Sequence, residues 1–229
     1  MSELLDTPLF GVIISIIAFE IGLYVNRKTK LSLLNPLLVS ILLIVVFLLK
    51  FDISLETYNK GGDLISFFLG PATVILAVPL YKQFQLLKEN AVPILIGITA
   101  GCATAIISVL VLVDLFNLNG PIGISILPKS ITTPIGIEVS KQIGGIPAVT
   151  VTAIIITGIV GTVIAPIVLK IFKIEDKVAA GIAIGTSSHA LGTTKAVELG
   201  ETQGAMSSLA IGVAGLITVL LAPLVTKLL

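Results

Sequence analysis

Charged residues are scarce in this sequence. Only 12% of its 229 residues are Asp, Glu, Lys or Arg, whereas soluble domains carry about 25%. Hydrophobic residues make up 55%, and the mean hydropathy is +1.13. Such a chain cannot cover a water-exposed surface of the usual kind, so we expect an integral membrane protein with the lipid bilayer as its main partner. The net charge of +1 gives no argument for binding to nucleic acid.

Residues for metal binding and catalysis are equally few. Cys102 is the only cysteine, which excludes an intramolecular disulfide, and His189 is the only histidine. No Cys/His spacing indicates a metal site, and no nucleophile, base and orienting residue appear together. We therefore expect no metal, no cofactor and no enzymatic activity.

Long apolar runs make up most of the sequence. A helix needs roughly 20 apolar residues to cross a bilayer. The runs cover residues 31–49, 64–81, 91–113, 146–169 and 202–226, and residues 7–25 form another that only Glu20 interrupts. They lack the alternating pattern of outer-membrane strands. The sequence predicts an all-α, polytopic transmembrane helical bundle that forms a single domain over residues 1–229.

The basic residues orient these helices. Cytoplasmic loops of membrane proteins carry an excess of Lys and Arg. If residues 116–145 enter and leave the membrane by the same face, nine basic residues lie on one side. These are Arg27, Lys28, Lys30, Lys82, Lys88, Lys170, Lys173, Lys177 and Lys227. We therefore predict a re-entrant segment beside a cavity, in a cell (inner) membrane protein with its N-terminus outside and its C-terminus in the cytoplasm.

A weak internal repeat accompanies this pattern. Gly101, Gly158 and Gly215 recur at a spacing of 57 residues, and Pro166 and Pro223 follow the same spacing. Broken helices at matching positions of repeated units indicate a transporter binding site. Chance matching between apolar helices is the alternative explanation.

Three Gly- and Pro-interrupted segments carry the polar chemistry. The first contains Gly70, Pro71 and Thr73. Pro71 cannot donate a backbone hydrogen bond, so a kink or helix break is expected there. The break either serves helix packing or presents the Thr73 hydroxyl to a substrate.

The second segment lies between two prolines. Its residues are Pro128, Lys129, Ser130, Thr132, Thr133 and Pro134. A lysine, hydroxyl groups and the N–H groups of a helix that starts near Pro134 would together favour a carboxylate. The alternative is an external loop with a solvated lysine.

The third segment runs from Gly185 to Lys195. Gly185 and Gly192 are candidate helix breaks, and Ser187, Ser188 and Thr193 are candidate substrate ligands. An unperturbed imidazole titrates near neutral pH, so His189 could relay a proton, although a lone histidine also serves as a structural hydrogen-bond donor. Small and hydroxylated residues equally allow close helix packing.

The remaining charges at membrane depth are Glu20, Glu138 and Lys195. Charged groups within a membrane usually pair with one another or line a substrate path. We expect them to serve in charge pairing or proton relay, with Glu20 paired to Lys129 or Lys195.

Three motifs resemble those of the LrgB/CidB family of antiholin-like and holin-like bacterial membrane proteins. In chain order they are LGPATVILAVPLY, LPKSITTPIG and GTSSHALGTTKA. The chain also resembles the C-terminal half of the plastid glycolate/glycerate translocator. The resemblance implies a small LrgA/CidA-type membrane partner and a homo- or hetero-oligomer. It further implies a link to murein hydrolase control and to movement of pyruvate-like or glycolate-like monocarboxylates.

Two functions therefore remain. The chain is a transporter or channel subunit for a small carboxylate, or an antiholin-like regulator of murein hydrolase activity and lysis that has no substrate. Lys129 between two prolines favours transport, because a purely regulatory subunit has no need of a charge there.

Overall fold

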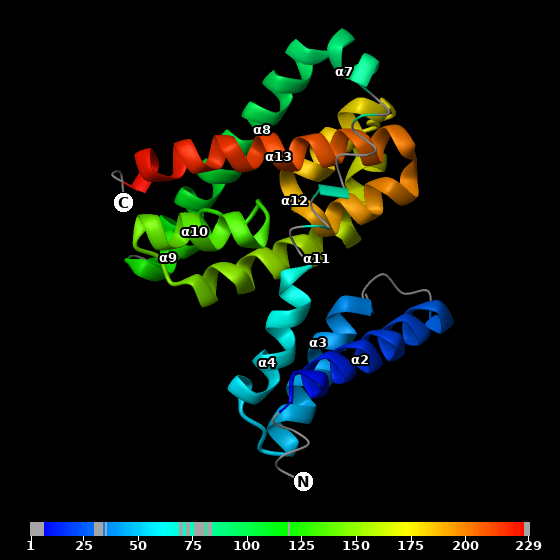
Figure 1. Ribbon diagram of the computed structural model, residues 1–229. Coiled ribbons are helices and arrows are strands. Elements are labelled where there is room, and N and C mark those ends of the chain that lie inside the picture. The colour runs from blue at the N-terminus through cyan, green and yellow to red at the C-terminus, as the bar shows by residue number, and fades with distance from the viewer. Residues whose placement is uncertain are drawn as a thin grey trace. The chain divides into compact units, whose positions relative to one another are not determined.

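The computed structural model describes residues 7–29, 34, 36–68, 71, 74–75, 81, 84–118 and 120–226. These residues are mostly helical and contain no strand, which confirms the predicted all-α class. The chain forms two compact units, Met1–Ile75 and Leu76–Leu229 (Figure 1). Each unit is described by itself, and the single domain over residues 1–229 stays a prediction.

The first unit consists of α2 (Pro8–Thr29), α3 (Pro36–Lys50) and α4 (Leu55–Phe67). Helices α2 and α4 touch at Gly11 and Gly61, where a Cβ added to Gly11 would lie 2.9 Å from the Gly61 Cα atom. Ser40 of α3 donates a hydrogen bond to the carbonyl of Ala18 in α2 at 3.2 Å. Small residues therefore set the helix contacts of this unit, as is typical of membrane helices.

Helix α4 is not among the predicted segments. The Ser54 hydroxyl accepts a hydrogen bond from the Thr57 N–H at 3.2 Å and so caps the start of the helix. Its charged and polar residues hide it from a search for apolar runs. The predicted span over residues 64–81 is not one continuous helix, because α4 ends at Phe67. Most of the remaining positions of that span lie outside the described residues.

The second unit holds the other helices. They are α7 (Phe84–Glu89), α8 (Ala91–Leu115), α9 (Pro121–Ile126), α10 (Thr133–Ile143), α11 (Pro147–Ile171), α12 (Lys177–Leu199) and α13 (Glu201–Val225). Only Gly200 separates α12 from α13, and the two helices pack closely side by side (Figure 1). Buried residues of α8, α12 and α13, among them Ile98, Ile182 and Met206, form the main apolar cluster.

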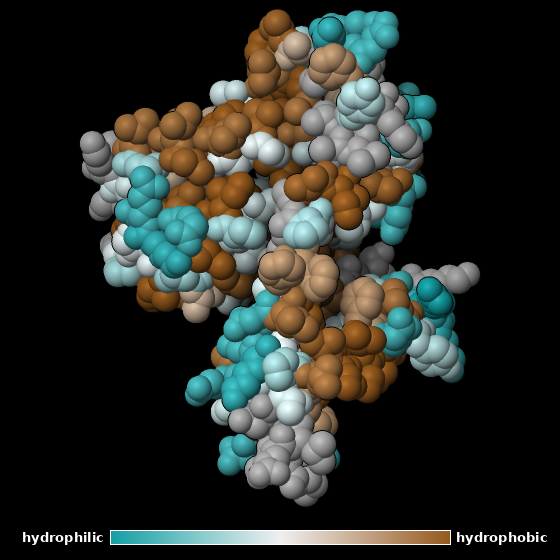
Figure 2. All heavy atoms as spheres, viewed as in Figure 1, coloured by the Kyte–Doolittle hydropathy of each residue, from teal (hydrophilic) through white to brown (hydrophobic). Residues whose placement is uncertain are grey.

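Four helices, α2, α8, α11 and α13, are long and apolar enough to cross a membrane. On α13, Leu216, Leu220 and Leu224 are exposed at a spacing of four residues. Figure 2 shows hydrophobic side chains over much of the surface of each unit. In water such a surface would be unfavourable, whereas in a bilayer it contacts lipid. The predicted multi-pass membrane protein is confirmed.

Helices α9 and α10 form a hairpin. Two glycines near α10 lie close to residues near α9. A Cβ atom added to Gly145 would lie 3.0 Å from the Ser125 Oγ atom, and one added to Gly136 would lie 3.6 Å from the Pro128 carbonyl oxygen. The chain therefore reverses direction between α9 and α10. Its turn is buried at Leu127, Pro128 and Ile131. With 6 and 11 residues, neither helix can cross a bilayer. This is the shape expected of a re-entrant segment, and the side on which it enters the membrane stays a prediction.

Hydroxyl groups hold the hairpin against α11. Thr150 of α11 lies 2.8 Å from the Ser125 carbonyl oxygen and 2.7 Å from the Ser140 Oγ atom, so its hydroxyl can donate to either. The N–H of Ile146 donates to the Ser125 hydroxyl at 2.7 Å. All three hydroxylated side chains are buried, where an unpaired polar group would be costly.

Candidate functional site

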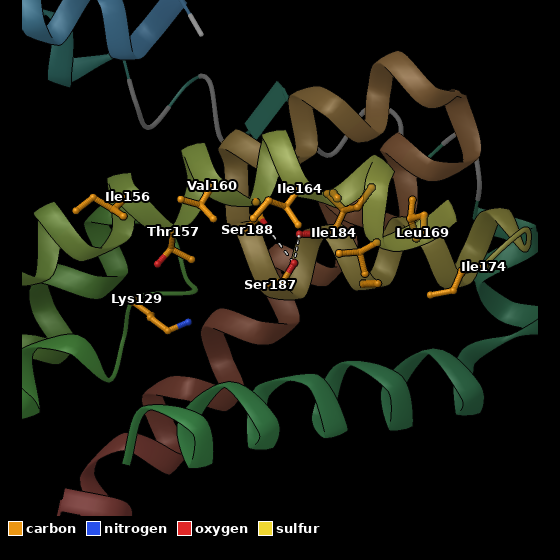
Figure 3. Close-up of a pocket in the computed structure, with 14 residues that line it drawn as sticks. Lys129, Ile156, Thr157, Val160, Ile164, Leu169, Ile174, Ile184, Ser187 and Ser188 are labelled. Atoms are coloured by element: carbon orange, nitrogen blue, oxygen red, sulfur yellow. Dashed lines mark hydrogen bonds between the residues drawn. The ribbon is translucent and has the colours of Figure 1, made fainter. Parts of the chain in front are cut away.

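A groove of about 470 Å³ lies within the second unit, between α11, α12 and the turn that precedes α10. Lys129, Thr157, Ser187 and Ser188 supply its polar groups (Figure 3). The remainder is aliphatic and extends along α11 toward Ile174. The groove thus brings together the second and third polar segments of the sequence.

Lys129 is the charged group of the groove. Its ammonium donates a hydrogen bond to the Ser130 hydroxyl at 3.2 Å. Among the described residues of the second unit, no carboxylate lies within ion-pair distance of the Lys129 ammonium. A partly buried charge without a counter-charge is unfavourable, so the site favours an anion.

Helix α10 begins beside Lys129. Thr132 is its N-cap residue in an extended conformation, and Thr133 and Pro134 occupy its first two positions. Among the described contacts, no side chain caps the first N–H groups of α10. These N–H groups and the helix dipole both favour negative charge at this end. The predicted helix start near Pro134 is confirmed.

The helix break in α12 lies at His189. This residue has φ 44° and ψ −142°, so two helical pieces meet there at a kink. Such a backbone conformation is unfavourable for residues other than glycine. The predicted breaks at Gly185 and Gly192 are wrong, because both residues lie inside α12 and only His189 within it has non-helical angles.

The two glycines serve close packing instead. A Cβ added to Gly185 would lie 2.4 Å from the Ser207 carbonyl oxygen of α13. A Cβ added to Gly192 would lie 2.5 Å from the Cβ atom of Ser188. Gly185 therefore sets the distance between α12 and α13, and Gly192 leaves room beside the break.

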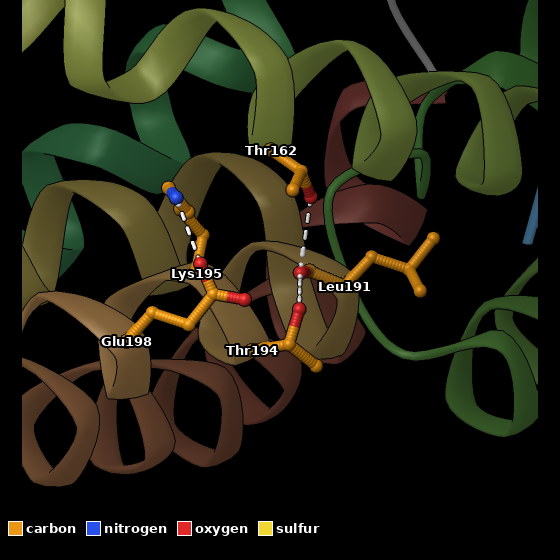
Figure 4. Close-up of polar contacts among 5 residues, drawn as sticks. All are labelled: Thr162, Leu191, Thr194, Lys195 and Glu198. Carbon is orange, nitrogen blue, oxygen red and sulfur yellow. Dashed lines mark hydrogen bonds and ion pairs between the residues drawn. The ribbon is translucent and has the colours of Figure 1, made fainter. Parts of the chain in front are cut away.

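Helix α11 holds the break in place. The His189 Nε2 atom lies 2.8 Å from the Ile154 carbonyl oxygen, and the His189 side chain is buried. Thr162 donates a hydrogen bond to the Leu191 carbonyl at 3.0 Å (Figure 4). A Cβ added to Gly158 would lie 2.8 Å from the Nε2 atom of His189, so only glycine leaves space for the imidazole.

Thr193 also binds the backbone at the helix break. Its hydroxyl lies 3.0 Å from the His189 carbonyl oxygen and 2.7 Å from the Ser207 hydroxyl, and it is buried. Thr193 does not line the groove. We therefore assign it to the structure of the break rather than to a ligand. Ser130 is buried, does not line the groove and accepts a hydrogen bond from the Lys129 ammonium.

The remaining predicted charges lie in exposed pairs or on exposed surface. Glu138 pairs with Lys141 at 2.8 Å, and Lys195 pairs with Glu198 at 2.7 Å (Figure 4). The predicted pairing of Glu20 with Lys129 or Lys195 would join the two units and stays a prediction. Glu20 is exposed on α2 of the first unit. Such exposed pairs contribute little to stability, about 0–1 kcal/mol.

The first polar segment stays largely untested. Gly70 and Thr73 lie outside the described residues, and Pro71 is exposed. Within the described part of the chain, no group of three His, Cys, Asp or Glu side chains could hold a metal ion.

Sequence reasoning missed Thr157, Thr162 and the Ile154 carbonyl. The two threonines lie in a continuous apolar run, where their hydroxyl groups were the only available signal.

Comparison with known proteins places the chain in a family. The profile of the LrgB-like family matches residues 15–228. The chain belongs to the LrgB family. It is 39% identical over 219 residues, 95% of each chain, to the antiholin-like protein LrgB of Bacillus cereus (strain B4264). The antiholin-like protein LrgB of Bacillus anthracis (strain CDC 684 / NRRL 3495) matches it to the same extent. No solved structure matches this member of the LrgB family.

Proposed function

We propose that this protein is an antiholin-like component of the cell membrane that works with a small LrgA/CidA-type membrane protein. The names of its LrgB relatives and the match over 95% of each chain support this role. Regulation of murein hydrolase activity would be its cellular consequence. The test is to delete the gene and to measure the rate of autolysis, with and without the partner.

The geometry favours a second, molecular function: binding and passage of a small monocarboxylate such as pyruvate or glycolate. One observation carries it. Lys129 lines the same groove as Ser187 and Ser188, and no carboxylate among the described residues of the second unit neutralises its ammonium. A carboxylate would supply the missing counter-charge and accept hydrogen bonds from the ammonium and both hydroxyls. Uptake and autolysis are separate measurements, so the two proposals can be tested separately.

Substitution of Lys129 tests the carboxylate site. In vesicles that contain the full chain and an LrgA-type partner, Lys129→Ala should abolish uptake of labelled pyruvate and glycolate. Lys129→Arg should retain part of the uptake, because arginine keeps the charge but has a different shape. Lys141→Ala is the matched control, since Lys141 lies on α10 of the same hairpin in an exposed pair with Glu138.

The outcomes separate the two functions. Full uptake by the Lys129→Ala variant would contradict the carboxylate site. If that variant loses uptake but restores normal autolysis in the deletion strain, the regulatory role does not depend on the bound anion. Loss of both functions in a stably inserted variant would link regulation to the carboxylate.

A further inference from the structure

The groove is larger than a two- or three-carbon acid needs. Its volume of about 470 Å³ lies within the range of roughly 300–1,000 Å³ that is typical of pockets for drug-sized ligands. The carbon skeleton of acetate or pyruvate contains one or two bonds of about 1.5 Å each. Such an acid would occupy only the part of the groove that Lys129 and the two serines line.

The rest of the groove is an apolar trough. Val160, Ile164 and Val168 of α11 line it at a spacing of four residues, and Ala183 and Ile184 of α12 face them. From Gly161, which faces Ser188, to Leu169 the helix rises about 12 Å, at about 1.5 Å per residue. No charged side chain other than Lys129 is among the described residues that line the groove (Figure 3). Ser188 lies against Gly161, between Val160 and Ile164, so the apolar trough extends beyond the polar groups along Ile164, Val168 and Leu169 (Figure 3).

We propose that this site takes a straight-chain aliphatic carboxylate, with the carboxylate at Lys129, Ser187 and Ser188 and the alkyl chain along Ile164, Val168 and Leu169. This inference rests on the proposed carboxylate site and specifies its substrate class. The charge complementarity at Lys129 selects an anion rather than a neutral alkyl chain. An eight-carbon acid has seven carbon–carbon bonds and extends over about 10 Å, which fits the length of the trough.

Direct binding of acetate and octanoate tests the proposal. The full chain in nanodiscs of phosphatidylcholine would be titrated with each labelled acid at pH 7. A buried methylene is worth about 0.8 kcal/mol, or roughly fourfold in affinity, so we expect octanoate to bind at least ~30-fold more tightly than acetate. Lys129→Ala should weaken binding of both acids, and methyl octanoate, which has no charge, should not compete.

Two isoleucines of α11 provide a matched pair. Ile164 lines the groove and is 44% exposed, whereas Ile167 lies outside it and is 54% exposed. Ile164→Phe should reduce octanoate binding at least fivefold, leave acetate binding unchanged and preserve thermal stability. Ile167→Phe should change neither acid.

Each outcome has a separate meaning. Equal binding of acetate and octanoate, both dependent on Lys129, would overturn this inference and leave the carboxylate site intact. Absence of any Lys129-dependent binding would overturn both. A preference for octanoate that persists in Lys129→Ala, or competition by methyl octanoate, would show that the groove binds lipid chains or an apolar helix, and would also overturn the inference.

Discussion

The imidazole of His189 and the main-chain carbonyl of Ile154 join the two helices that frame the groove, with 2.8 Å between Nε2 and the carbonyl oxygen. This contact lies at the one residue of α12 whose backbone is not helical. The hydrogen bond therefore offsets part of the cost of the break. It also fixes the position of Ser187 and Ser188, the two residues that precede His189 in the chain.

Substitution of His189 should show what holds the break. His189→Ala loses the hydrogen bond and keeps an unfavourable backbone conformation, so we expect it to lower stability by about 1–3 kcal/mol. His189→Gly also loses the bond but adopts the positive φ more easily, and its loss should be smaller. Thermal unfolding of the purified variants would measure both. An alanine variant as stable as the glycine variant would contradict strain at this residue.

The same residue allows a test of the proton-relay hypothesis. His189→Gln keeps a hydrogen-bond donor but does not titrate between about pH 5 and 8. If His189 relays protons, the glutamine variant should lose uptake against a gradient and the pH dependence of uptake, but keep downhill exchange. If uphill uptake and the pH profile are unchanged, His189 serves only as the hydrogen-bond donor to Ile154.

Two buried threonines of α12 should respond differently to valine. The Thr193 hydroxyl binds the His189 carbonyl and the Ser207 hydroxyl, whereas the Thr186 hydroxyl has no partner among the described residues. Thr193→Val should reduce stability by about 0.6–2 kcal/mol. Thr186→Val should leave stability unchanged or raise it, because an unsatisfied buried hydroxyl is removed. Equal losses in thermal unfolding would indicate that Thr186 binds an ordered water.

Two helical glycines form another matched pair. A Cβ at Gly185 would lie 2.4 Å from the Ser207 carbonyl oxygen, whereas a Cβ at Gly212 would have no atom of the described residues within 4 Å. Gly185→Ala should therefore separate α12 from α13 and lower thermal stability markedly. Gly212→Ala should be neutral or stabilising by up to about 1 kcal/mol, since alanine favours helix. A Gly185→Ala variant that unfolds at the wild-type temperature would contradict the close contact.

Cysteine labelling tests the membrane orientation. After removal of Cys102, single cysteines at exposed positions Lys28, Asn59 and Lys173 would be treated in intact cells with a thiol reagent that cannot cross the membrane. We expect reaction only at position 59, since Lys28 and Lys173 belong to basic regions that should be cytoplasmic. Labelling at position 173 in intact cells would place that loop outside and contradict the re-entrant assignment of residues 116–145.

Much of the fold could be predicted from local patterns. The long helices follow from apolar runs, and the hairpin turn follows from Pro128 and Pro134. The polar character of the segments that contain Lys129, Ser187 and Ser188 could be predicted. That these residues line one groove could not, because the groove is formed by residues distant in sequence.

The position of the break could not be predicted from α12 alone. Glycine is the usual candidate for an unusual backbone conformation, which indicated Gly185 and Gly192. The break lies at His189 because the Ile154 carbonyl binds its imidazole and Gly158 leaves room for it. Both partners belong to α11, more than 30 residues earlier in the chain. Tertiary contacts therefore decide between residues that are all possible break points.

The hydroxyl contacts of the hairpin constrain the order in which the protein is made. Ser125 and Ser140 leave the ribosome before Thr150 and Ile146 can bind them, and the Ser125 carbonyl lies 2.8 Å from the Thr150 hydroxyl. In hydrocarbon such groups are costly without partners. If α9 and α10 re-enter the membrane as predicted, we therefore expect them to reach their final position only after α11 has been made, which would make the hairpin a late step in biogenesis despite its position in the middle of the chain.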